Sequence, residues 1–181
     1  MSIVVAEYDP HWATTFEQLR LSIWPAVADL AISVEHVGST SVPGLAAKPI
    51  IDMTVVVPTA ADVPTAINCL GVLGYVHRGN LGVEGREAFQ APGSLPRHHL
   101  YLCASNSLAL RNHLVVRDYL RAHPEIARQY GDLKERLAER YPEDIDAYTE
   151  GKTQLILRIL SEAGLRSDEL DTIGQINRRT V

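Results

Sequence analysis

The chain has 181 residues, of which 46% are hydrophobic and 22% are charged, and its net charge is −5 at pH 7. This length fits one compact domain, and the acidic balance argues against a general nucleic-acid binder, which usually carries a basic excess. The apolar runs are too short to span a bilayer, and the first ten residues lack the pattern of a secretory signal. The two cysteines, Cys69 and Cys103, show no metal-binding spacing. We therefore expect a cytoplasmic protein without a membrane partner.

The first half of the chain predicts alternating helices and strands. Apolar residues at helical spacing predict a helix over residues 11–30, which Pro25 ends or kinks. Residues 31–37 alternate loosely and predict a strand. Residues 49–57 are rich in β-branched side chains and predict a buried central strand. A second amphipathic pattern predicts a helix over residues 61–73.

The chain then becomes rich in glycine before it turns helical. Residues 75–93 suit short strands and loops, and residues 79–95 suit a flap. Residues 97–104 predict a strand whose pleat separates two sets of side chains, Arg97, His99 and Tyr101 on one face and His98, Leu100 and Leu102 on the other.

Three apolar stripes predict three helices after residue 105, over residues 106–122, 125–139 and 143–163. Residues 166–181 are expected to be a polar, frayed tail. The predicted fold is therefore a single mixed α/β domain over residues 1–165. Residues 1–104 form its sheet-containing part, and residues 105–165 form its helical part.

The stretch from His36 to Asp52 carries most of the chemical information. It predicts a strand end, a Gly38-Ser39 turn, a short helical turn and a strand bearing Asp52. Backbone N–H groups at such a turn, with the hydroxyls of Thr40 and Ser41, suit a phosphate group. The alternative is that either hydroxyl only caps the helical turn. Lys48 either balances a phosphate or is an exposed loop lysine.

Asp52 stands in an otherwise apolar strand, where an unpaired carboxylate is costly. It is therefore a candidate metal ligand, together with His36 and one of His98 and His99, since these two point to opposite faces of a strand. Imidazole with carboxylate suits Zn²⁺ or Mn²⁺ better than Mg²⁺. Arg97 and Arg117 either clamp a phosphorylated ligand or form ion pairs on the surface.

Three segments resemble the GrpB family (UPF0157): HVGSTSVPGLAAKPIID, RHHLYL and RDYLRAHPEIARQYGDLK. The resemblance covers roughly residues 5–163 and implies the nucleotidyltransferase fold of the DNA polymerase beta type, with a small mixed sheet. It also implies that Gly38 and Ser39 form a phosphate-binding turn and that Asp52 is the first metal-binding carboxylate. Thr54 stands where active members of that superfold carry a second acid, and Glu87 is the nearest candidate for a third.

Three functional hypotheses follow. In the first, the chain is a nucleotidyltransferase that binds a nucleotide at Gly38-Ser39, with Asp52 and Lys48 as catalytic residues and a divalent cation, Mg²⁺ or Mn²⁺, at Asp52. In the second, which Thr54 favours, it is a non-catalytic module that binds a nucleotide or another phosphorylated small molecule. In the third, it is a hydrolase with a histidine–Asp52 metal centre, for which Zn²⁺ is a candidate. Nothing in the sequence indicates the substrate or the oligomeric state.

Overall fold

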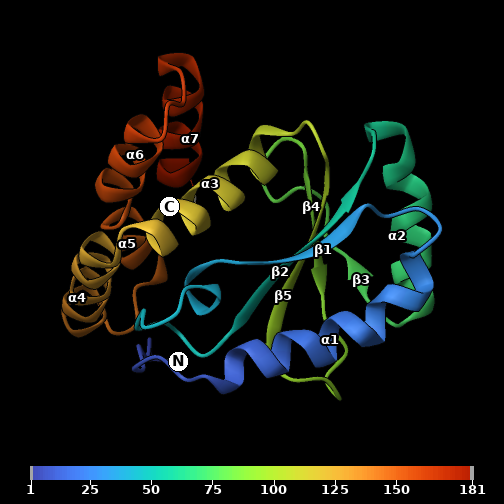
Figure 1. The fold of residues 1–181 in the computed structure, drawn as a ribbon, viewed down its shortest axis with the longest axis horizontal. Helices are drawn as coiled ribbons and strands as arrows, with labels where there is room; N and C mark the ends of the chain where they lie inside the picture. The colour runs from blue at the N-terminus through green and yellow to red at the C-terminus, as the bar shows by residue number, and fades with distance from the viewer. Residues whose placement is uncertain (1, 180–181) are drawn as a thin grey trace.

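The computed structural model describes residues 2–179, which form a mixed α/β fold around one five-stranded sheet (Figure 1). The strand order is β1-β2-β5-β4-β3, and β2 and β5 form its parallel pair. The strands are β1 (Ser33–Val37), β2 (Ile51–Val57), β3 (Val76–His77), β4 (Arg86–Gln90) and β5 (His98–Ala104). The predicted fold class, a small mixed sheet followed by a helical region, is confirmed.

Helices cover both faces of this sheet and extend beyond one end of it (Figure 1). Two helices pack on one face, namely α1 (His11–Val27) and α2 (Val63–Val72). On the opposite face lies α3 (Leu108–Ala122). The remaining helices form the helical layer: α4 (Pro124–Arg140), α5 (Ile145–Glu150), α6 (Thr153–Glu162) and α7 (Ser167–Arg179).

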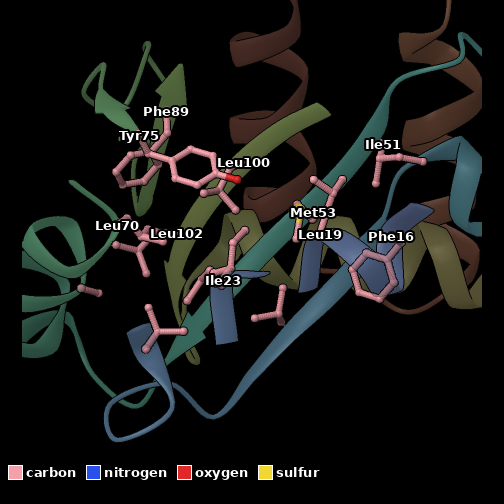
Figure 2. Close-up of a cluster of buried hydrophobic side chains, with 14 of the residues drawn as sticks. Phe16, Leu19, Ile23, Ile51, Met53, Leu70, Tyr75, Phe89, Leu100 and Leu102 are labelled. Atoms are coloured by element: carbon pink, nitrogen blue, oxygen red, sulfur yellow. The ribbon is translucent and has the colours of Figure 1, made fainter. Parts of the chain in front are cut away.

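The main core lies between the sheet and the α1–α2 face, as Figure 2 shows. The side chains that build it are large and apolar, so their removal from water is the main stabilising term. They come from α1 at helical spacing and from β2 and β5 at every second position, as in Leu19, Ile23, Met53, Leu100 and Leu102. This packing holds the central strands and therefore fixes where their other faces point.

The pairing of β2 with β5 decides which polar side chains share a face. Asp52 is opposite His99, and Thr54 is opposite Tyr101, in the parallel register. Because alternate residues of a strand point to opposite faces, all four lie on the face that α3 covers. Met53 faces the α1 side. The predicted separation of His99 and Tyr101 from the apolar face of β5 is confirmed.

The helical layer differs from the prediction at two places. The single helix expected over residues 143–163 is two helices, α5 and α6, because Gly151 and Lys152 form a turn between them. Gly151 packs tightly there, since a Cβ would lie 3.0 Å from Cδ1 of Leu137 in α4. The expectation of a frayed tail was wrong over residues 167–179, which form α7 and bury Ile173 against α6. Residues 180 and 181 lie outside the described residues.

No helix in the described part of the chain combines the length and the apolar character that crossing a membrane requires.

Candidate functional site

The site begins at the turn that follows β1, and its shape depends on Gly38. This residue has φ +69°, a conformation that side-chain-bearing residues rarely adopt. A Cβ here would lie 2.9 Å from the carboxyl carbon of Asp52. Glycine therefore allows the turn to approach the carboxylate of β2 closely, as its place in the predicted phosphate turn requires.

Two of the four predicted phosphate-binding residues have hydroxyls that hold the turn itself. Ser41 Oγ donates to the Gly38 carbonyl at 2.6 Å, and Thr40 Oγ1 lies 3.0 Å from Nε2 of His36. Both residues are buried. The Ser39 side chain hydrogen-bonds Tyr130. The capping alternative is not what the structure shows, because Ser41 donates to a carbonyl of the turn and no side chain caps the short helix Ser39–Ser41. Gly38 and Ser39 line the open cavity described below.

Asp52 lies at the start of β2 and pairs with a histidine of the neighbouring strand. Its Oδ1 is 2.8 Å from Nδ1 of His99. The side chains are 29% and 48% exposed respectively, so both reach solvent. Of the histidines proposed as metal ligands, His99 is the one that the fold brings to Asp52.

The turn, Asp52 and three lysines enclose one cavity of about 260 Å³, which we call the site cavity. Lys48 comes from the loop before β2, Lys134 from α4 and Lys152 from the turn between α5 and α6. The cavity is lined by Gly38, Ser39, Thr40, Ala47, Lys48, Ile50, Asp52, His99, Tyr130, Lys134, Tyr148 and Lys152. The sheet thus supplies the carboxylate, and the helical layer supplies two of the three cations.

Burial and mutual repulsion lower the pKa values of these lysines. Burial, together with the nearby charge of Lys152, lowers the pKa of Lys134 to about 7. Burial, with the charge of Lys48, lowers the pKa of Lys152 to about 8. The pKa of Lys48 is also lowered, chiefly by burial. Lys134 donates to the Ala46 carbonyl. An anion in the cavity would favour the charged form of all three lysines.

Tyrosine rings separate the ammonium groups. The Tyr148 ring has Nζ of Lys152 at 4.4 Å and Nζ of Lys48 at 5.4 Å from its centre. Nζ of Lys134 lies 4.6 Å from the centre of the Tyr130 ring. The Tyr148 hydroxyl is buried and has no hydrogen-bond partner within residues 2–179. Such a group is uncommon in folded proteins.

Two predicted ligands, His36 and His98, lie on the opposite face of the sheet. His36 stacks on Phe16 of α1 with ring centres 4.5 Å apart, and burial lowers its pKa to about 4. Nδ1 of His98 donates to the Pro96 carbonyl at 2.7 Å, so its Nε2 accepts from the Tyr75 hydroxyl at 2.8 Å. Strand alternation therefore keeps both imidazoles away from Asp52, and each has a structural role.

The carboxylates that would accompany Asp52 are not in the cavity. Glu87 pairs with Leu102 in the β4–β5 register, which places it on the apolar face, and it forms an ion pair with His77 at 2.6 Å. Thr54 is fully buried, and its hydroxyl lies 3.4 Å from Nδ1 of His113 in α3. The position of the expected second acid is thus covered by α3.

Neither predicted arginine lines the site cavity. Arg117 pairs with Glu35 at 2.8 Å and with Asp118 at 2.7 Å, which fastens α3 to β1. Of the two predictions for Arg117, the ion pair is the one that the structure shows. Arg97 is exposed and lines a separate surface cavity beside Lys48. A third arginine, Arg121, donates from Nε and Nη2 to the Ser41 carbonyl at 3.0 and 2.7 Å, which ties α3 to the glycine turn.

Lys134, Lys152, Tyr130 and Tyr148 were not predicted. The sequence feature that could have identified them is a lysine within an apolar stripe of a helix. Lys134 lies between Tyr130 and Leu137, and Lys152 lies between Tyr148 and Leu155, each at a spacing of three or four residues. A lysine at such a position is turned toward the interior and needs a reason to be there.

Comparison with known proteins supports the resemblance found in the sequence. The family model described as "GrpB protein" matches residues 2–162. The UPF0157 protein YqkA of Bacillus subtilis is 39% identical over 82% of this chain, which spans only 43% of the length of that relative. A crystal structure of GrpB from Enterococcus faecalis has a TM-score of 0.78 and 37% identity, covering 88% of this chain and 96% of the other.

A more distant neighbour is the Cid1 poly(U) polymerase in a structure with bound MgGTP. Its TM-score is 0.49 and its identity 17%, over 75% of this chain and 45% of the other. At this level the match says nothing about activity. The family model spans residues 2–162, which include the glycine turn, Asp52 and the lysines of the helical layer. The chain belongs to the GrpB family.

Proposed function

We propose that the protein binds a nucleotide, or another phosphorylated small molecule, with its phosphates in the site cavity. The observation that carries this proposal is the convergence of Lys48, Lys134 and Lys152 on one cavity that holds a single carboxylate, Asp52. Three ammonium groups against one carboxylate leave an excess of positive charge, and a polyphosphate supplies the matching negative charge.

The unpartnered hydroxyl of Tyr148 supports the same ligand. The hydroxyl is buried, and the ring that carries it lines the cavity with the ammonium groups of two lysines near its centre. A hydrogen bond to a phosphate oxygen would remove the cost of an unsatisfied buried donor, about 1–3 kcal/mol. The Gly38–Ser39 turn lines the cavity beside Asp52 and leaves backbone close to the ligand.

Nucleotidyl transfer is the reaction that this arrangement would serve. An oxygen of the acceptor attacks the α-phosphorus and forms a new P–O bond, while the bond from that phosphorus to the bridging oxygen breaks. Pyrophosphate leaves, and the attacking hydroxyl releases its proton to water. The three lysines would stabilise the charge on the leaving pyrophosphate, and the two walls of the cavity would hold donor and acceptor in position.

A divalent cation fits Asp52 only with help from the ligand. Residues 2–179 contain no group of three His, Cys, Asp or Glu side chains that could hold a metal ion. Mg²⁺ and Mn²⁺ prefer oxygen ligands, and Mg²⁺ is often held by one or two carboxylates together with substrate phosphates. Asp52 would therefore hold the ion jointly with the phosphates. The ion would supply further neutralisation of phosphate charge.

The second candidate is a non-catalytic module that binds the same ligand without a cation. The covering of Thr54 by α3 favours it, because the second carboxylate of a two-metal site has no place there. The histidine–Asp52 hydrolase has the least geometrical support, since only His99 of its three histidines lies beside Asp52. A cytoplasmic location is part of our proposal, as the free thiols of Cys69 and Cys103 suit a reducing compartment.

The test is a thermal-shift titration with the four ribonucleoside triphosphates, with and without Mg²⁺ or Mn²⁺, together with an assay for pyrophosphate release. A ligand of the native state raises the melting temperature. We expect the shift and any release to need both the cation and Asp52, and to be lost in Asp52→Asn without a change in the melting temperature of the free protein. A shift that needs neither would favour the module, and no shift with any triphosphate would contradict both.

A further inference from the structure

A second cavity of about 200 Å³ adjoins the site cavity, and we call it the inner chamber. The two cavities share Gly38, Tyr130 and Lys152 as lining residues. The other walls come from α3, from the end of α5, from the start of α6 and from α7. A molecule with phosphates in the site cavity therefore has this chamber directly beside it.

The lining of the inner chamber is more apolar than polar and is almost free of charge. Lys152, at the edge shared with the site cavity, is its one lysine, and no Arg, Asp or Glu of the described residues lines it. Asn112 and Asn177 contribute side-chain amides, and Val116 and Ile156 contribute aliphatic surface. His113 also lines it, and burial lowers the pKa of this imidazole to about 4, so it is neutral at pH 7.

Thr153 is the lining residue of this chamber that has a buried, unpaired hydroxyl. The residue is 6% exposed, and its Oγ1 is buried without a hydrogen-bond partner among residues 2–179. Buried hydroxyls normally have a partner. The first residue of α6 thus places an unpaired hydroxyl in the wall of the inner chamber.

From these contacts we infer that the inner chamber binds the base of a nucleotide whose phosphates occupy the site cavity. This rests on the proposed function and names the substrate class within it. A nucleobase is planar and uncharged and has an edge of hydrogen-bond donors and acceptors, which suits two amides and a hydroxyl between aliphatic side chains. A charged group would find no partner there beyond Lys152, and an acyl chain would leave Asn112 and Thr153 unpaired.

Calorimetric titrations with tripolyphosphate and with ATP, GTP, CTP and UTP test this inference. Tripolyphosphate fills the site cavity alone, whereas a nucleotide fills both cavities. We expect at least one nucleotide to bind ten times or more tightly than tripolyphosphate. Thr153→Val, which replaces the hydroxyl by a methyl group of similar shape, should reduce that advantage at least threefold and leave tripolyphosphate affinity unchanged. The matched control is Thr65→Val, on an exposed position of α2.

Two other results would overturn the inference. If no nucleotide binds more tightly than tripolyphosphate, or if Thr153→Val leaves the advantage intact, the base does not lie in the inner chamber, and phosphate binding in the site cavity still stands. If neither tripolyphosphate nor any nucleotide binds, the proposed function itself fails. The two failures are therefore distinguishable.

Discussion

At the scale of single residues, the site depends first on Gly38. Two separate features require a glycine here, the positive φ and the close contact with Asp52. Another glycine of the chain has only the positive φ and can serve as a control. Gly44 has φ +77° but nothing within 4 Å of the position of a Cβ. The two glycines thus separate the strain of the backbone from the crowding of the carboxylate.

We predict that Gly38→Ala destabilises the fold by about 2–4 kcal/mol, because its conformation (φ +69°, ψ −173°) is one that essentially only glycine adopts and costs another residue about 1–3 kcal/mol, and the clash with Asp52 adds to it. Gly44→Ala should cost only the first part. Urea unfolding of both variants measures the difference. If both variants lose the same free energy of unfolding, Asp52 moves aside easily. The close approach of the turn to the carboxylate would then contribute nothing to stability.

The lysine pKa values make phosphate binding dependent on pH. Lys134 and Lys152 have pKa values of about 7 and about 8 in the free protein, and a bound anion raises both. Binding then takes up protons, so affinity for sulfate, a phosphate-like anion whose charge is constant in this range, should fall as the pH rises from 7.5 to 9.5. Titrations across this range measure the slope, and Lys134→Met should flatten it. An unchanged affinity across the range would contradict these pKa assignments.

The predictable part of the site was the part that lies close together in the sequence. Gly38, Asp52 and Lys48 belong to one stretch of the chain, and turn chemistry with an isolated strand carboxylate was enough to select them. Lys134 and Lys152 escaped because they stand in apolar stripes, which we assigned wholly to the core. Their approach to Asp52 depends on how the helical layer packs against the sheet, and periodicity does not contain that information.

At the scale of elements, α3 positions the glycine turn. Arg121 donates twice to the Ser41 carbonyl, and Arg117 pairs with Glu35 at the neighbouring edge of the sheet. The helix therefore holds both β1 and the turn that follows it, although neither arginine lines the site cavity.

We expect Arg121→Met to weaken tripolyphosphate binding about threefold or more while it destabilises the fold by about 1 kcal/mol, since a hydrogen bond from a charged group contributes about 1.5–3 kcal/mol when it is shielded and less when it is exposed. Calorimetry and urea unfolding provide the two values. Arg128→Met, on an exposed position of α4, is the control. If both variants bind alike, the turn does not need its anchor on α3.

The position of α7 was missed because its sequence is mostly polar, with few apolar residues at helical spacing. Those few still bury a surface, and Ile173 is 3% exposed against Leu160 and Leu165. The register of β4 was also beyond prediction. Nothing in a short glycine-rich segment says which of Glu87 and Ala88 faces Asp52, and one residue of slip reverses the answer.

Ile173→Ala tests whether α7 is packed as the structure has it. A large-to-small change at a buried position costs about 2–5 kcal/mol, so the variant should unfold at clearly lower urea concentration than the parent chain. Leu21→Ala, at a 61% exposed position of α1, should cost little. If Ile173→Ala loses no more stability than the control, α7 is not packed, and the frayed tail expected from the sequence is the better description.

At the scale of the whole molecule, the site belongs to neither half of the chain alone. The sheet supplies Gly38, Asp52 and His99, and the helical layer supplies Lys134, Lys152 and two tyrosines. An overall charge of −5 therefore coexists with a cavity of opposite sign. Fold class and family were readable from the sequence, because a long local motif and clear periodicity carry them. The charge of the site was not, because it arises from residues that folding brings together.

The measurement that tests this account most directly is the calorimetric affinity of tripolyphosphate for the parent chain, for Lys152→Met and for the control Arg128→Met. Removing a charged hydrogen-bond donor from a buried phosphate site costs about 1.5–3 kcal/mol, or roughly a tenfold to hundredfold weaker Kd. We predict that loss in Lys152→Met and parent-like binding in Arg128→Met. Equal affinities in all three proteins, or no binding to the parent chain, would contradict a phosphate site among the three lysines.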